Sequence, residues 1–118
     1  MLALLMLFIL SSSASIVDVD AASNFDIMPN ANYSAEISSN PSAGIIWAMI
    51  SDDDSKMIIP NPHGVFYVNT TDKTKGFQKI DFECKDCVSG QETYALFVLK
   101  RPWKNDASLV RKITFNVK

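Results

Sequence analysis

Few residues of this 118-residue chain have the types and spacing that enzyme chemistry needs. The one histidine, His63, lies between Pro62 and Gly64, where a solvated turn residue is more plausible than a general base held within reach of a substrate. A structural zinc site takes four ligands, more than one histidine and two cysteines supply. The adjacent acids at 52–54 lack the alternate spacing of a calcium-binding loop and indicate a solvent-exposed turn. The sequence therefore predicts a protein that is not an enzyme and needs neither a metal nor a cofactor.

Cys84 and Cys87 form a CxxC pair that has two interpretations. In a cytosolic βαβ unit this spacing indicates thioredoxin-type chemistry, so a small redox protein is one alternative. No helical pattern follows the pair in this chain, and the N-terminal segment points to an oxidising compartment. A local disulfide across a turn is therefore favoured over two free thiols. Because the bridged loop is so short, the bond should stabilise less than a long-range one.

The N-terminal segment has the character of a secretory signal. Its first ten residues are MLALLMLFIL, and small residues follow at 11–15. Ten apolar residues are too few to span a bilayer, which takes about 20. We expect a cleaved signal peptide at 1–14, cut after Ala14 or alternatively near Ala21 or Ala22. A buried N-terminal strand and an uncleaved anchor are the other possibilities.

The rest of the chain is expected to form one domain, at 23–118, with a leader boundary between 14 and 22. The formal net charge is 11 − 13 = −2, which gives no footprint for nucleic acid. Asn32 and Asn69 begin sequons and are candidate glycosylation sites. We expect a monomer in the secretory pathway, bound for the endosome, lysosome or phagosome or for the outside of the cell, with no membrane segment after cleavage.

Short apolar stretches, separated by turn signals about every 8–12 residues, predict an all-β sandwich of about seven strands. The expected strands are 33–38, 45–50, 57–59, 65–68, 77–84, 93–100 and 112–118. Segment 77–84 alternates, with Ile80, Phe82 and Cys84 on one face. Segment 45–50 is apolar on both faces, which predicts a central strand with Trp47 in the core.

Three loops between these strands form a recognisable series. The first loop (residues 40–44) consists of Asn40, Pro41, Ser42, Ala43 and Gly44. The second loop (residues 73–77) consists of Lys73, Thr74, Lys75, Gly76 and Phe77. The third loop (residues 101–103) consists of Arg101, Pro102 and Trp103. This order resembles the chagasin-like inhibitors of cysteine peptidases, whose motifs are an NPTTG-type loop, a glycine-rich GxGG loop and an RPW loop.

The resemblance covers the chain from about residue 25 to its end and implies an immunoglobulin-like β-sandwich with the three loops at one end. It implies a reversible, tight-binding inhibitor of papain-like peptidases, including cathepsin L-like ones. The first loop would lie over the catalytic cysteine of the peptidase, and the other two loops would flank it. Such inhibitors occur in parasitic protozoa and some bacteria, and a protozoan member is implied.

The residue types of the loops suit that role. Pro41 fixes φ and stiffens the first loop, and Gly44 permits either a positive φ or a close approach of another backbone. A pre-organised loop loses less entropy when it binds. Arg101 and Trp103 belong to the residue types most enriched at interface hot spots, and the polar residues after Trp103 favour its exposure.

The chain departs from the family pattern in two loops. Ser42 and Ala43 stand where the NPTTG-type loop has threonines, and Gly76 is the one glycine of the second loop. Because immunoglobulin-like domains host many functions, an adhesion or carbohydrate-binding module is the alternative. That alternative predicts exposed aromatic residues on a sheet face rather than in loops at one end.

Overall fold

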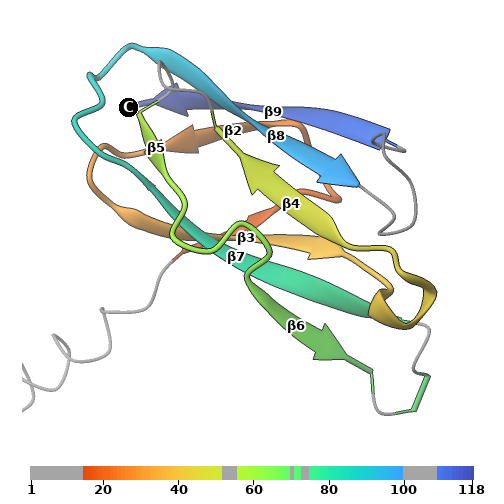
Figure 1. Cartoon of the computed structure of the whole chain (residues 1–118). Coiled ribbons are helices and arrows are strands. Elements are labelled where there is room, and N and C mark those ends of the chain that lie inside the picture. The colour runs from red at the N-terminus through yellow and green to blue at the C-terminus, as the bar shows by residue number, and fades with distance from the viewer. Residues whose placement is uncertain (1–14, 52–55, 70, 73–74, 100–108) are drawn as a thin grey trace, which may run out of the picture.

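A computed structural model describes residues 15–51, 56–69, 71–72, 75–99 and 109–118. These residues form nine β-strands in two sheets and one turn of 3₁₀-helix, η1 (Pro41–Ala43) (Figure 1). The strands are β1 (Ser15–Asp18), β2 (Asn24–Ile27), β3 (Asn32–Ser38), β4 (Trp47–Ile50), β5 (Met57–Ile58), β6 (Val65–Val68), β7 (Gly76–Cys84), β8 (Glu92–Leu99) and β9 (Leu109–Val117).

The first sheet is built around β3 and β7, which pair antiparallel so that Ser38 lies opposite Phe77. β1 runs parallel to β3 along its other side. Two short strands share the far side of β7: β6 pairs with its first half and β5 with its last residues. β6 therefore lies at the end of the sheet where β3 ends and β7 begins (Figure 1).

The second sheet has the order β2-β9-β8-β4, with β2 parallel to β9 and the other pairs antiparallel. The expectation of a central strand at 45–50 is wrong, because β4 is the edge strand of the described sheet. A turn covers its outer side instead: the Met49 N–H donates to the Pro62 carbonyl at 2.9 Å, and His63 Nδ1 lies 3.0 Å from the Trp47 carbonyl oxygen. The outer backbone groups of β4 are thus satisfied by the turn at Pro62 and His63 instead of by another strand.

The core lies between the two sheets and follows the expected alternation. In β7, Ile80, Phe82 and Cys84 are all buried. The rings of Phe82 and Phe115 join the sheets with their centroids 5.2 Å apart. The prediction of an all-β sandwich is therefore confirmed. Trp47 is also buried as predicted, with 7% of its surface exposed.

Two strands, β1 and β2, are additional to the seven expected. Each has four residues and pairs in parallel with a strand distant in sequence, so neither has a long alternating pattern. Val17 and Val19 are buried in the core, so the sandwich includes residues ahead of the expected domain start at 23. Residues 1–14 lie outside the described part, and signal cleavage stays a prediction.

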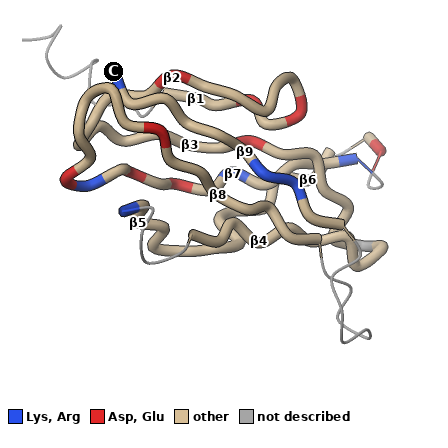
Figure 2. Tube along the Cα trace, turned by 90° about the horizontal axis from the view of Figure 1, so that it is seen from above, with Lys and Arg blue, Asp and Glu red and all other residues tan. Residues whose placement is uncertain are grey.

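Figure 2 shows Lys and Arg interspersed with Asp and Glu along the described chain. Within the described ranges, no helix has the length and apolar character needed to cross a membrane. Among the same residues, no group of three or more His, Cys, Asp or Glu side chains is placed to hold a metal ion.

Candidate functional site

The ends of the strands that lead into and out of the three loops meet at one end of the sandwich. The Ser39 N–H donates to the Gly76 carbonyl at 3.0 Å, so the first loop leaves beside the start of β7. Trp47, just after the first loop, lies opposite Leu99, which in turn lies opposite Leu109. The chain therefore enters and leaves 100–108 at the end of the molecule that carries the first loop and the end of β6, on the right of Figure 1.

The first loop closes on itself. Asn40 and Ile45 exchange two backbone hydrogen bonds, of 3.1 and 2.9 Å, and so form its neck. Inside the neck, the Ala43 N–H donates to the Asn40 carbonyl at 3.1 Å and the Gly44 N–H to the Pro41 carbonyl at 3.0 Å. The loop is therefore a compact knob whose backbone donors are largely used internally.

Pro41 and Gly44 explain why this sequence forms a knob. Pro41 occupies the first position of η1, where its fixed φ suits a helical turn and its missing N–H is no loss. Gly44 ends the turn with φ of 72° and ψ of 17°, a left-handed conformation of the kind that glycine was expected to permit. Ala43 is exposed and Pro41 is half-buried. The knob thus presents the small side chain of Ala43 on a fixed backbone.

The second loop is described in part, because Lys73 and Thr74 lie outside the described residues. Its ends are tied: the Asn69 N–H donates to the Lys75 carbonyl at 2.9 Å, and the Asn69 Oδ1 accepts the Thr71 N–H at 2.8 Å. Gly76 is required by a close backbone approach, because a Cβ there would lie 2.5 Å from the Tyr67 carbonyl oxygen. The glycine thus lets β6 pair tightly with β7.

An exposed apolar strand adjoins the second loop. All four residues of β6 are exposed, from 38% at Phe66 to 56% at Val65. The Tyr67 ring stacks on Phe77 with centroids 4.9 Å apart. A surface pocket of about 300 Å³ opens between Ser38, Tyr67 and Lys75. Apolar surface is therefore available beside the first loop.

The third loop, with Arg101, Pro102 and Trp103, lies outside the described residues, as does the acidic run at 52–54. The two candidate glycosylation sites are both exposed. Asn69 lies beside Lys75, at the end of the sandwich that carries the loops. Asn32 is the first residue of β3, whose last residue, Ser38, leads into the first loop, so Asn32 lies at the other end of the sandwich. A glycan on Asn69 would therefore stand next to the candidate site.

Gln78 is a residue of the site that the sequence analysis missed. It is fully buried, and its Oε1 accepts the Trp47 N–H at 2.8 Å. Its Nε2 donates to the carbonyl oxygens of Trp47 and His63, each at 2.8 Å. The Trp47 indole N–H donates to the Ser38 carbonyl at 3.0 Å, at the entry to the first loop. This network joins both sheets at the base of the knob.

A signal for Gln78 was present in the sequence, since it shares the inward register of Ile80 and Phe82. A polar residue in such a register needs buried partners. His63 behaves as expected of a turn residue: it is exposed, and its Nδ1 lies 3.0 Å from the Trp47 carbonyl oxygen.

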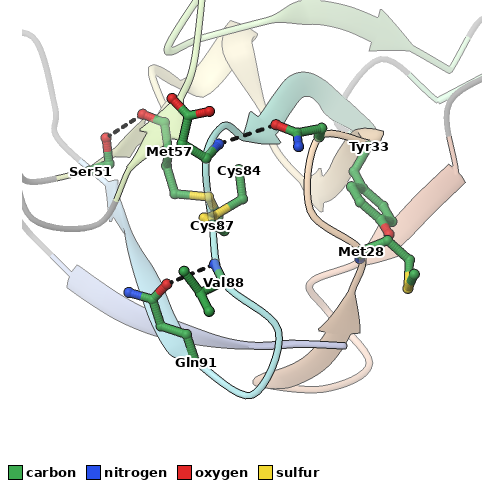
Figure 3. Close-up of a disulfide and its surroundings, with 10 residues drawn as sticks. Met28, Tyr33, Ser51, Met57, Cys84, Cys87, Val88 and Gln91 are labelled. Atoms are coloured by element: carbon green, nitrogen blue, oxygen red, sulfur yellow. Dashed lines mark hydrogen bonds between the residues drawn. A yellow bond between two sulfur atoms is a disulfide. The ribbon is translucent and has the colours of Figure 1, made fainter.

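Cys84 and Cys87 are joined by a disulfide in the structure, with their Cα atoms 5.7 Å apart. Figure 3 shows it in the turn after β7, where the Gln91 side chain accepts the Val88 N–H at 3.1 Å. Eight residue steps of β7 separate Cys84 from Gly76, about 26 Å at ~3.3 Å per step. The disulfide therefore lies at the end of the sandwich opposite the loops.

No protein-family model matches this sequence, and no curated protein matches it either. Solved structures share its fold, among them the following two. One is EhICP2, a cysteine protease inhibitor from Entamoeba histolytica, with a TM-score of 0.66 and 13% identity over 89% of this chain and 96% of that one. The other is amebosin, with a TM-score of 0.61 and 17% identity over 91% of this chain and all of that one. The fold is therefore the immunoglobulin-like sandwich of the chagasin-like inhibitors, as the resemblance implied.

Proposed function

We propose that this chain is a reversible, tight-binding inhibitor of papain-like cysteine peptidases, including cathepsin L-like ones, and that it blocks their active-site cleft with three loops. The observation that supports this most is the first loop: a closed knob at the end of the sandwich where the other two loops also begin. The fold shared with a solved cysteine protease inhibitor adds weight.

The internal bonding of the first loop explains how it would resist cleavage. Peptidases bind substrates in extended form, pairing with free backbone groups of the peptide. The N–H groups of Ala43, Gly44 and Ile45 already donate within the loop. The knob would fill the cleft without offering an extended segment, and little entropy would be lost because the loop is already ordered. Inhibition is then steric and has no covalent step.

The other two loops would supply most of the affinity. Arg101 and Trp103 are the residue types that dominate interface hot spots. On the second-loop side, exposed Tyr67 and Val68 offer apolar surface beside Lys75. The protein would act as a monomer, reaching its target through the secretory pathway in an endosome, lysosome or phagosome or outside the cell.

The test is a titration of papain and a cathepsin L-like peptidase with purified chain lacking residues 1–14. We expect competitive inhibition at nanomolar concentration. Replacing Trp103 with Ala should weaken binding by at least about 1–2 kcal/mol, as hot-spot truncations do. Asp53→Ala, in the acidic run at 52–54, is the control and should bind like the parent. Folded protein that fails to inhibit at tens of micromolar would refute the proposal.

One observation favours a second candidate, an immunoglobulin-like adhesion or carbohydrate-binding module. Phe66 and Tyr67 are exposed on the edge strand β6, at 38% and 45%, and aromatic side chains on a sheet are what such a module would use. Binding to a glycan panel that Tyr67→Ala abolishes, together with no peptidase inhibition, would favour this candidate.

A further inference from the structure

A side chain just after the N-terminal strand β1 holds the entry to the first loop. Asp20 follows β1, and its Oδ2 accepts two hydrogen bonds from Ser38, at 2.9 Å from the backbone N–H and at 2.6 Å from the hydroxyl. Ser38 is the last residue of β3, two positions before Asn40 at the neck of the knob. Hydrogen bonds to a carboxylate are stronger than those between neutral groups. The start of the first loop is thus anchored to the N-terminal segment.

The same serine also anchors the strand that leaves the first loop. Its carbonyl oxygen accepts the indole N–H of Trp47 at 3.0 Å. The next residue, Ser39, donates its N–H to the Gly76 carbonyl at 3.0 Å. The N–H and carbonyl of Ser38 and the N–H of Ser39 therefore all form hydrogen bonds with neighbouring segments. Movement of Ser38 would carry the knob with it.

Arg111 extends this arrangement to the other sheet. It lies two residues after the start of β9, where the chain returns from 100–108, and it shares the inward register of Ile113. Its Nη2 donates to the Val19 carbonyl at 2.6 Å, and its Nη1 lies 3.9 Å from the Asp20 Oδ1. Val19 itself is fully buried, and its N–H donates to the Glu36 carbonyl. The arginine thus spans the sandwich at its loop end.

We propose that Asp20, Ser38 and Arg111 form a clasp that sets the first loop relative to the return strand of the third loop. In this role Asp20 is a positioning residue: it strengthens peptidase binding without touching the peptidase. The inference rests on the proposed function. The positions of the loops relative to one another matter because conformational freedom that remains before binding must be lost on association. A wedge of several loops therefore binds more tightly when their relative positions are already fixed.

The position at which the expected signal peptide is cut decides whether the clasp is retained. A cut after Ala14 leaves β1, Val19 and Asp20 in place. A cut after Ala21 or Ala22 removes them all, including the two buried core valines, Val17 and Val19. Of the cleavage positions considered for the signal peptide, the first alone yields a chain with a complete clasp.

The experiment measures papain inhibition by the full chain, produced and processed in eukaryotic cells, against three variants. Asp20→Ala removes the clasp acceptor. Ser38→Ala removes one of its two donors. Asp26→Ala is the matched control: it makes the same charge change in an exposed ion pair, with Lys118 at 3.9 Å, at the other end of the sandwich. Dissociation rates are measured with folded, active protein, and the melting temperature is measured in parallel.

We expect Asp20→Ala to weaken inhibition about five- to tenfold, through faster dissociation, and Ser38→Ala about two- to threefold, while Asp26→Ala binds like the parent. A merely structural role of Asp20 would lower the melting temperature and leave the dissociation rate of the folded protein unchanged, and this result would overturn the clasp. If Asp20→Ala does not fold, unchanged dissociation of Ser38→Ala has the same consequence. A parent protein that does not inhibit refutes the proposed function itself, and the clasp with it.

Discussion

Replacing Gln78 with Met should lower the free energy of unfolding by about 2–5 kcal/mol, because it removes a buried amide that three backbone groups depend on. Met has a similar length and no branching, so little cavity or overpacking is introduced. The amide is fully buried and makes three hydrogen bonds of 2.8 Å, one from the Trp47 N–H and two to the carbonyl oxygens of Trp47 and His63.

The three backbone groups do not contribute equally. The Trp47 N–H belongs to a buried residue and would lose its acceptor outright, a loss of about 1–3 kcal/mol. The Trp47 carbonyl retains His63 Nδ1 at 3.0 Å, and the His63 carbonyl belongs to an exposed residue within reach of water. These two add about 0.5–1 kcal/mol each. Against a total stability of about 5–15 kcal/mol, the change is large.

Urea unfolding followed by tryptophan fluorescence measures the change, with Lys79→Met as the control. Lys79 is the next residue of β7 and faces the other side of the sheet, half-exposed. The same incoming side chain there should alter stability by no more than about 0.5 kcal/mol. If both variants are equally stable, the Gln78 network does not hold the base of the first loop, and the reasoning fails.

Three further outcomes are expected. Gly76→Ala should destabilise the protein by about 1–3 kcal/mol, because its Cβ would lie 2.5 Å from the Tyr67 carbonyl oxygen; an unchanged melting temperature would contradict the close approach. Gly44→Ala places a side chain at a φ of 72°, which costs roughly 1–2 kcal/mol of conformational strain. Because that strain falls on the first loop, the variant should show clearly weaker papain inhibition and only a small decrease in melting temperature. Equal inhibition by that variant would show that the knob's shape is not needed. The double variant Cys84→Ala, Cys87→Ala should lose about 2 kcal/mol of stability, the closure entropy of a four-residue loop, and keep its inhibition constant, since the disulfide lies at the opposite end; weakened inhibition would instead connect this pair to function.

Local patterns in the sequence were sufficient for much of the fold. The two-residue alternation that put Ile80, Phe82 and Cys84 on one face of a strand depends on the backbone alone, so it holds wherever that strand lies. The conformation at Gly44 was foreseeable for a similar reason, because a turn after Pro41 leaves few residue types that can adopt a positive φ. The burial of Trp47 followed from the apolar run around it.

What local patterns could not determine is which distant segments meet. β4 is as apolar as a central strand, yet it lies at an edge because the Pro62–His63 turn occupies its outer side. β1 and β2 become strands through parallel pairing with β3 and β9, and four residues are too few to show a period.

The contacts of Asp20 and Gln78 show the same limit at the site. Asp20 meets Ser38 across 18 positions of sequence, and Gln78 meets Trp47 across 31. A carboxylate or an amide has no preferred partner in the chain; its partner is whichever donor or acceptor the assembled sheets bring within about 3 Å. Local sequence patterns were enough to predict seven of the nine described strands and the residue types of the loops. The tertiary structure alone decided how the loop bases are held together, because those bonds exist only once the two sheets have packed.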